Sequence, residues 1–503
     1  MKKQYFHPCI ALVIILMISA DLNSQVTVST KNPHYFFYRM KPMVLITSDH
    51  HYGAIIDMDF DFIKYLDYLA DNGMNLTRIY PGGMFEPPDK YLKGNPLGPR
   101  KGRQLLPWAK SEVPGANPFL AIDGKPSYKY DLDKWNPAYF SRLKAFVEHA
   151  RIKDIIVEIP FFNGMYADCW PLMAMYHSNN IQNIGHYEAI DCGIYTTTDT
   201  RNKEIIKYQK AYIKKIVTEL NNYDNLIFDI CDEPSLQGLP DGNIIVHPDS
   251  IITPWINEMK DAFLEAEGSL PKKHLLGQTV QNLSPDLSDN QWCTWLPCEY
   301  VAPADKAIGL DYLKNKPIVD VETNYFGTSL TRYAYNADAV RLEGWWFMFS
   351  GGAGIINLNG KFFHGQESGD TITRTQIIPQ KKILKDFMDR LDINGLSRYT
   401  GLKVASGLTS CRCIAETGKQ YAVYLYHAAP DKQWGSSFVP EPGNYCDTLT
   451  INSVPAGTYV TEWIDPLTGS VKSSEIMNYI GGELKLITPF YPLDIALKIT
   501  SRK

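Results

Sequence analysis

The sequence predicts an α/β protein in which a (β/α)₈ TIM barrel is followed by a small C-terminal antiparallel β-sandwich. Strand-like and helix-like segments alternate from about residue 42 to residue 395. Two of the strand-like runs end in acidic residues, which is typical of barrels that hold their chemistry at the carboxyl ends of the strands. After Gly401 the chain changes to short alternating runs separated by turns, which is the pattern of a sandwich.

The amino terminus has the pattern of a signal peptide. The chain opens with Met-Lys-Lys, continues with an apolar run from Ile10 to Ile18 and then turns small and polar. We therefore predict a signal peptide over residues 1–24, with cleavage near Ala20 or Ser24. The apolar run is much shorter than the roughly 20 residues that span a membrane. The pattern predicts a secreted or periplasmic protein without a membrane span.

The predicted barrel occupies residues 25–400. Its helices carry apolar residues on one face; the first presents Phe62, Leu66 and Leu69 and stops at Gly73. We expect strands at residues 42–48, 75–80, 155–161, 225–233, 275–280, 292–296, 316–322 and 351–358, and helices at 59–71, 137–150, 203–221, 254–266, 336–346 and 381–391.

The predicted sandwich occupies residues 401–503. Alternating runs at residues 420–426 and 457–463 have the period of half-buried strands. The segment Asp465-Pro-Leu-Thr-Gly469 has the composition of a turn. We expect this domain to brace the barrel.

Composition excludes several classes of partner. The net charge of −5 offers no basic surface to nucleic acid, and no CxxC pair or His-rich cluster has metal-site spacing. We expect no nucleic-acid partner, no metal and no cofactor. Cys231 and Cys293 lie in apolar segments typical of buried thiols, whereas Cys169 and Cys192 could form a disulfide in an oxidising compartment; the sequence leaves the pairing open.

Two glutamates end strand-like runs: Glu233 in Asn225-Leu-Ile-Phe-Asp-Ile-Cys-Asp-Glu-Pro-Ser235 and Glu322 in Pro317-Ile-Val-Asp-Val-Glu-Thr-Asn-Tyr325. Near-continuous apolar runs are typical of buried parallel strands, so the two side chains are expected at the carboxyl ends of the fourth and seventh strands. A retaining glycosidase needs one protonated carboxyl as acid and one carboxylate as nucleophile. The alternative is that the pair lines the barrel mouth as ion-pair partners.

These motifs resemble those of glycoside hydrolase clan A, which includes the family 5 cellulases and mannanases. Asp232-Glu233-Pro234 is similar to the Asn-Glu-Pro motif of its fourth strand, where the Glu is the acid/base, and Glu322 matches the nucleophile that ends the seventh. The segments 345–354 and 463–469 also resemble the apiosidase-like glycosidases, whose end domain is sometimes labelled collagen-binding. The resemblance covers nearly the whole mature chain and implies a retaining mechanism.

Asp232 departs from the clan pattern, because the clan usually has an Asn there that donates to the sugar 2-hydroxyl. An ionised Asp232 can only accept, and its charge would raise the pKa of Glu233. The alternative is that Asp232 itself takes part in proton transfer. Arg78 ends the second strand and resembles the arginine that holds the nucleophile ionised. Alternatively, Arg78 forms an ion pair with Asp320 or Asp229.

Histidine and aromatic residues provide further candidate sugar contacts. His50 and His51 follow the first strand and point to opposite faces, so they do not chelate one metal, although one of them could reach the substrate. Tyr325 follows the seventh strand, and Trp345 or Trp346 precedes the eighth; each could stack on a sugar. Core packing is the alternative for at least one of the two tryptophans.

The sequence thus predicts a secreted retaining hydrolase of poly- or oligosaccharides. Long connections after the second, third, fourth and eighth strands favour a pocket or short cleft, and hence a chain-end or short-oligosaccharide substrate. One alternative is a catalytically inactive barrel that binds carbohydrate, in which Asp232 is the first departure from the catalytic pattern of the clan. Another is a cell-surface adhesion or matrix-binding protein, suggested by the label of the end domain.

Overall fold

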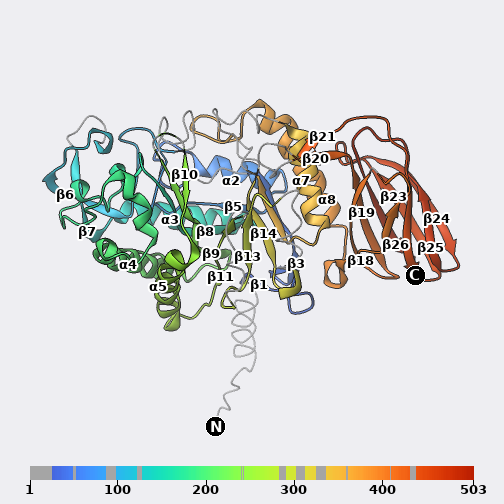
Figure 1. Ribbon diagram of the computed structural model, residues 1–503, viewed down its shortest axis with the longest axis horizontal. Coiled ribbons are helices and arrows are strands. Elements are labelled where there is room, and N and C mark those ends of the chain that lie inside the picture. Colours follow the sequence, from blue (N-terminus) through green and yellow to red (C-terminus); the bar gives the residue numbers. More distant parts are fainter. Residues whose placement is uncertain are drawn as a thin grey trace, which may run out of the picture.

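The computed structural model describes residues 25–48, 53–86, 98–121, 127–239, 241, 243–281, 291–301, 312–323, 336–357, 361–407, 409–430 and 438–502. The predicted signal peptide lies outside these residues. Parallel strands form a barrel and antiparallel sheets follow it, which confirms the predicted fold class. In Figure 1 the helices α7 (Ala337–Phe349) and α8 (Ile378–Met388) lie between the barrel strands and the C-terminal sheets.

The barrel ring closes through parallel ladders and, at two positions, through single backbone hydrogen bonds. Ladders join β5 to β8, β8 to β9, β9 to β11, β12 to β13, β13 to β14, β14 to β15 and β15 to β4. The Asn75 amide donates to the Ile46 carbonyl at 3.3 Å, and the Thr294 amide donates to the Leu276 carbonyl at 2.9 Å. The strands are β4 (Leu45–Ser48), β5 (Leu76–Arg78), β8 (Ile156–Tyr166), β9 (Leu226–Gly238), β11 (Leu275–Gly277), β12 (Val280–Gln281), β13 (Leu296–Glu299), β14 (Ile318–Glu322) and β15 (Gly354–Asn357).

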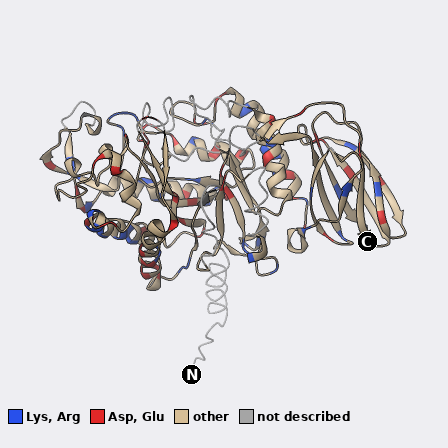
Figure 2. Cartoon of the chain, viewed as in Figure 1, with Lys and Arg blue, Asp and Glu red and all other residues tan. Residues whose placement is uncertain are grey.

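Amphipathic helices alternate with these strands, and side chains cap the first two of them. Asp61 caps the first of them by accepting from the Lys64 amide, and Asn136 caps the next by accepting from the Ala138 amide. Figure 2 shows charged residues along these helices and acidic residues among the central strands. Besides α7 and α8, the barrel helices are α2 (Phe62–Asp71), α3 (Pro137–Ile152), α4 (Lys203–Leu220) and α5 (Asp249–Gly268).

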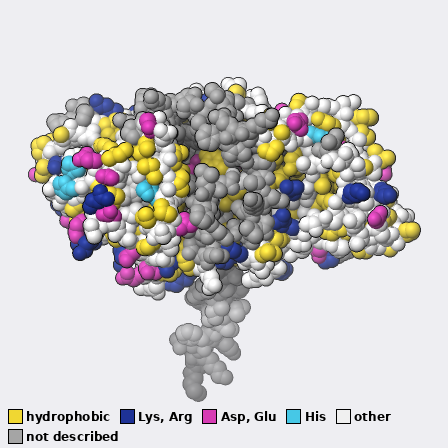
Figure 3. All heavy atoms as spheres, in the orientation of Figure 1, with side chains coloured by type: hydrophobic (Ala, Val, Ile, Leu, Met, Phe, Trp, Pro, Cys, Tyr) yellow, Lys and Arg dark blue, Asp and Glu magenta, His cyan; other side chains and the backbone are white. Residues whose placement is uncertain are grey.

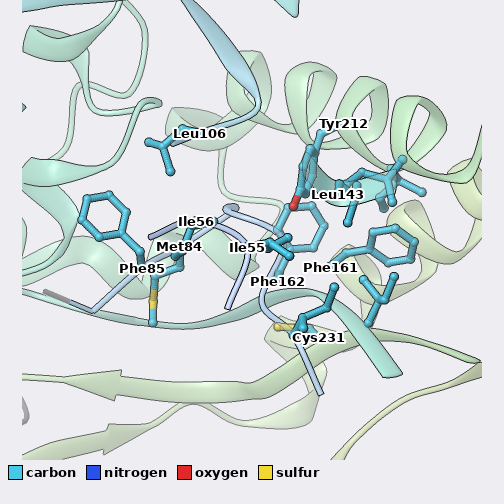
Figure 4. Close-up of a cluster of buried hydrophobic side chains, with 14 of the residues drawn as sticks. Ile55, Ile56, Met84, Phe85, Leu106, Leu143, Phe161, Phe162, Tyr212 and Cys231 are labelled. Atoms are coloured by element: carbon cyan, nitrogen blue, oxygen red, sulfur yellow. The ribbon is translucent and has the colours of Figure 1, made fainter. Parts of the chain in front are cut away.

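The larger core cluster packs the helices α2 to α5 against β8 and β9. Phe161 stacks on Phe228 with ring centroids 5.2 Å apart, and Phe162 contacts Trp255 edge-on at 5.3 Å. Figure 4 shows Phe161 and Phe162 near the Tyr212 ring and the thiol of Cys231. These aromatic contacts hold the two long strands that carry the candidate site.

The predicted first strand is two strands. β3 (Lys41–Met43) pairs antiparallel with β2 (Phe36–Tyr38), and with β1 (Thr27–Val28) they form a small sheet that the sequence analysis missed. The Val26 amide donates to the Asp224 carbonyl at 2.9 Å, just before β9 begins. The sheet therefore contacts the amino end of the barrel, opposite the end that carries the acidic residues.

The C-terminal sheets form two layers, ordered β16-β18-β19-β26-β23-β24 and β17-β22-β25. Every residue of β19 (Gln420–Tyr426) is buried. Alternate residues from Tyr421 to Leu425 pack between the two sheets, whereas Ala422, Tyr424 and Tyr426 join the cluster of α7 and α8. The other strands are β16 (Ser397–Arg398), β17 (Leu402–Val404), β18 (Ser410–Glu416), β22 (Thr448–Val454), β23 (Gly457–Ile464), β24 (Val471–Tyr479), β25 (Gly482–Ile487) and β26 (Asp494–Ser501).

Long connections leave the barrel from the carboxyl ends of β5, β8, β9 and β15, at the four places that the sequence predicts. The hairpin of β6 (Trp108–Pro114) and β7 (Tyr128–Trp135) follows β5, four short 3₁₀ turns follow β8, and β10 (Ile244–Val246) pairs with the end of β9. β10 is an edge strand with exposed apolar side chains, and Figure 3 shows such side chains gathered over it. Among the described residues, no helix combines the length and apolar composition that a membrane span requires.

The described cysteines are all free thiols, so the disulfide considered for Cys169 and Cys192 does not form. The Cys192 thiol contacts the Met165 carbonyl at 3.3 Å, and the Cys169 thiol contacts Asp168 at 3.6 Å. Each sulfur is thus directed to an oxygen and not to the other sulfur. Cys231 and Cys293 are buried thiols, as predicted.

Candidate active site

Glu233 lies in a bulge of β9. Asn163 of β8 pairs with Asp232, but the next pair joins Met165 to Gln237. One residue of β8 therefore faces residues 233–236 of β9. A bulge of this kind breaks the ladder and redirects side chains, and bulges are common beside active sites.

The bulge places Glu233 in a strained conformation. Its φ of 46° lies in the left-handed region, which is uncommon for residues other than glycine. The facing residue is Gly164, where a Cβ atom would collide with the carbonyl oxygens of Glu233 and Leu236. Strain of this kind is found at functional sites when the surrounding structure maintains it.

Glu322 is the last residue of β14 and is held by two donors. The Tyr300 hydroxyl donates to Glu322 Oε1 at 2.8 Å, and Arg78 Nη1 lies 3.5 Å from Glu322 Oε2. Tyr300 directly follows β13 and was missed in the sequence. The sequence placed the sixth strand at residues 292–296, whereas the strand observed is Leu296–Glu299. The residues at its carboxyl end were therefore not predicted as site residues.

Arg78 is a fully buried cation among five carboxyl groups. It contacts the predicted nucleophile and also Asp229, so both expectations for this residue are met; Asp320 is not among its described partners. The distances from a guanidinium nitrogen to a carboxyl oxygen are 2.5 Å for Asp232, 3.1 Å for Glu158, 3.5 Å for Glu322, 3.8 Å for Glu299 and 3.9 Å for Asp229.

Asp232 is fully buried, and its oxygens already accept hydrogen bonds within the protein. Arg78 Nη2 donates to Oδ1 at 2.5 Å, while Asn163 Nδ2 donates to Oδ2 at 2.8 Å and the Tyr80 hydroxyl donates to the same oxygen. This arrangement does not present Asp232 as an open acceptor for a sugar hydroxyl. It makes Asp232 the residue that orients Arg78.

The two glutamates differ in their electrostatic surroundings. Burial, followed by the nearby carboxyls of Glu322, Asp232 and Glu86, raises the pKa of Glu233 well above its ordinary value. The only described donor near its carboxyl is the Tyr166 hydroxyl, 3.5 Å from Oε2. Glu233 is therefore suited to carry a proton.

Glu322 is also buried, and burial and Asp232 raise its pKa to about 8. The Arg78 guanidinium and the Tyr300 hydrogen bond act in the opposite direction, because both stabilise the carboxylate. Glu322 is thus the glutamate of the pair whose ionised form the site supports.

Glu299, at the end of β13, is a second residue that the sequence analysis missed. One oxygen each of Asp232, Glu299 and Glu322 lie within 4.8 Å of one another, the only group among the described residues arranged to surround a cation. Arg78 contacts all three carboxyls, so its guanidinium supplies the positive charge there.

Trp345 is not a sugar contact, which corrects the prediction. It lies on α7, is fully buried and stacks on Tyr424 of the C-terminal sheet with ring centroids 5.5 Å apart. Trp346 is buried equally, so the alternative of core packing holds for both tryptophans. His50, His51 and Tyr325 lie outside the described residues.

No protein-family model and no curated protein matches the sequence. Solved structures do match it. A glycoside hydrolase family 5 protein from Bacteroides vulgatus ATCC 8482 is similar with a TM-score of 0.55 and 12% identity, over 96% of this chain and 94% of that one. The chain shares the glycoside hydrolase fold.

Two further structures show this fold over nearly the whole chain. A protein described as a glycoside hydrolase matches with a TM-score of 0.57 and 10% identity, over 96% of this chain and 98% of that one. A second Bacteroides vulgatus ATCC 8482 protein, assigned to the glycoside hydrolases only provisionally, matches with a TM-score of 0.62 and 13% identity, over 96% and 83%. At these identities the likeness establishes the glycoside hydrolase fold, and the roles of the site residues depend on their geometry.

Proposed function

We propose that this protein is an exported retaining glycoside hydrolase that cleaves O-glycosidic bonds in a poly- or oligosaccharide. One observation carries the proposal. Glu233, in the bulge of β9, and Glu322, at the end of β14, lie in different environments of a glycosidase-type barrel. Among the described residues, the Tyr166 hydroxyl is the only donor near the Glu233 carboxyl, whereas Glu322 lies between Arg78 and Tyr300. Glycosidases need this division between a protonated and an ionised carboxyl.

Glu233 acts as the acid in the proposed mechanism. Its raised pKa keeps the carboxyl protonated, so it can protonate the leaving glycosidic oxygen. After the aglycone leaves, the carboxylate removes a proton from the incoming water. The strained bulge of β9 fixes the backbone of this residue.

Glu322 acts as the nucleophile and forms a covalent glycosyl ester at the anomeric carbon. Tyr300 binds one of its oxygens and Arg78 lies next to the other, so the side chain is restrained before the substrate arrives. Water then displaces the ester, and two inversions leave the anomeric configuration unchanged.

The configuration of the first product tests the mechanism. Wild-type protein is assayed on a panel of aryl glycosides and polysaccharides, and NMR follows the first-formed anomer. Retention supports the nucleophile role, whereas initial release of the inverted anomer would refute it. Absence of turnover across the panel would favour a barrel that binds carbohydrate without catalysis.

Two variants separate the roles of the glutamates. Glu322→Ala should be nearly inactive, and added azide should yield a glycosyl azide of inverted configuration from an activated substrate. Glu233→Gln should slow substrates with poor leaving groups by about 10²–10⁴-fold while sparing glycosylation by activated ones. Equal losses on both substrate types would count against an acid role. Glu267→Gln is the control, since this buried glutamate lies on the outer helix α5 and binds His274.

Export forms a separate part of the proposal and depends on the pattern of residues 1–24. Expression of the full chain in a bacterium, followed by amino-terminal sequencing of the extracytoplasmic protein, tests it. We expect mature protein beginning near Gln25. An uncleaved protein retained in the cytoplasm would contradict export and leave the proposed reaction untouched.

A further inference from the structure

Both carboxyl oxygens of Glu299 are buried, and no N–H or O–H group of the described residues donates to either of them. The nearest cationic atom, Arg78 Nη1, is 3.8 Å from Oε1, which is beyond hydrogen-bond distance. A buried carboxylate without a donor carries a large desolvation cost. A protonated carboxyl avoids this cost, because it becomes a donor itself.

An acceptor for such a proton lies beside Glu299. One carboxyl oxygen of Asp232 and one of Glu299 lie within 4.8 Å of each other in the cluster with Glu322, so Asp232 is the acceptor nearest to a proton on Glu299 within this cluster. Asp232 is the member that Arg78, Tyr80 and Asn163 hold as an anion.

We propose that Glu299 is a positioning residue that stays protonated and donates its hydrogen bond to Asp232, so that Arg78 remains available to Glu322. The inference deepens the proposed function, on which it depends. No substrate atom is involved. An ionised Glu299 would compete for Arg78 and repel the carboxylates of its neighbours.

The charged and titratable groups facing Glu299 agree with this assignment. Arg78 faces it from β5, Asp232 and Glu233 from β9, and Glu322 from β14. One cation cannot balance all of these carboxyls. Burial and the adjacent Asp232 raise the pKa of Glu299 well above its ordinary value, while Arg78 and the hydrogen bonds to Asp232 lower that of Asp232.

Infrared difference spectroscopy of wild type against Glu299→Gln tests the proton without reference to catalysis. We expect the variant to lose the carbonyl band of a buried protonated carboxyl at pH 7. Loss of a carboxylate band instead would overturn the proposal. The measurement holds whether or not the protein hydrolyses glycosides, so a failure of the proposed function remains distinguishable.

Kinetics and stability provide the second readout. Glu299→Leu removes the donor and should lower kcat/KM by about tenfold or more and displace the acidic limb of the pH profile. Glu299→Gln should retain most of the wild-type kcat/KM and keep the acidic limb close to its wild-type position, because an amide N–H can still donate to Asp232. The control Glu158→Gln neutralises a buried glutamate that accepts from Arg78 Nε at 3.1 Å, and it should lower the melting temperature more than Glu299→Gln does.

A metal bound by the three carboxyls is the competing explanation. Its signature would be a melting temperature that rises with Ca²⁺ or Mn²⁺, falls with a chelator and loses this response in Glu299→Gln. That result would overturn the proposal. A melting temperature independent of both additions supports the protonated pair.

Discussion

The hydroxyl of Tyr300 donates a hydrogen bond to Glu322 Oε1 at 2.8 Å. Tyr300 directly follows β13 and Glu322 ends the neighbouring strand β14; these strands pair with a register shift that sets Glu299 beside Glu322. Tyr300 has a φ of 50°, so the chain turns sharply where the sixth strand ends. The bond both orients the proposed nucleophile and stabilises its ionised form.

Replacing Tyr300 by Phe should therefore move the acidic limb of the pH profile of kcat/KM to higher pH. The hydrogen bond lowers the pKa of Glu322, so its loss raises that pKa, and more alkali is needed to ionise the nucleophile. We expect kcat/KM at neutral pH to fall by about 10–100-fold. An acidic limb that stays in place would show that Tyr300 does not act through Glu322.

Replacing Asp232 by Asn should move both limbs of the pH profile to lower pH. Asp232 raises the pKa of Glu233 and of Glu322 by its negative charge, so neutralising it lowers both values. The basic limb reports the acid and the acidic limb reports the nucleophile. A shift of either limb to higher pH contradicts this argument, and unmoved limbs with lost activity would indicate a direct sugar contact.

Removing the C-terminal sheets should make the barrel insoluble or heat-labile. Trp345 stacks on Tyr424 across this boundary, and Arg341 forms a buried ion pair with Asp494. Cutting the chain after Thr400 would expose the apolar face of α7 and leave the Arg341 cation without its anion. A soluble, fully active barrel that has lost only polymer binding would show that the sheets form a binding module.

The point variant Trp345→Ala tests the same interface in the full chain. Truncating a fully buried tryptophan should lower the free energy of unfolding by about 3–5 kcal/mol, as measured by denaturant titration. KM should stay close to that of wild type, because the ring packs in the core against Tyr424 and Phe387. A selective rise in KM at unchanged stability would restore Trp345 as a sugar contact.

Glu343 should make the protein less stable as the pH rises from about 4 to about 8. Burial raises its pKa to about 8, although Thr323 donates to it, so the folded state retains a proton that the unfolded chain releases near pH 4.3. The stabilisation is complete below the unfolded pKa and is lost as the pH passes the folded one.

Glu343→Gln should remove this dependence. A tenfold difference in proton affinity corresponds to about 1.4 kcal/mol. Between pH 5 and pH 9 the free energy of unfolding of the variant should therefore rise by a few kcal/mol relative to that of wild type. Denaturant titrations at several pH values measure the difference, and Glu367→Gln, at a partly exposed lysine contact, is the control. Parallel pH profiles for wild type and Glu343→Gln would contradict the burial argument.

The sequence by itself determined the fold class and the positions of Glu233, Glu322 and Arg78, because these depend on local patterns. A buried parallel strand has a near-continuous apolar sequence, and the polar residue that follows this run lies at the carboxyl end of the barrel strands, where the chemistry takes place. The contact of Arg78 with Glu322 was expected from the resemblance to clan A, and the structure brings the two side chains together.

Only the tertiary structure decided which side chains meet. Tyr300 and Glu299 join the site because β13 begins four residues later than its composition indicates and shifts register against β14. Trp345 leaves the candidate site because the six-stranded sheet covers α7, and an apolar ring has the same sequence signature in a core as in a sugar subsite. Asp232 is a buried partner of Arg78 because three distant residues converge on it, and such convergence depends on packing between strands, which local sequence does not encode.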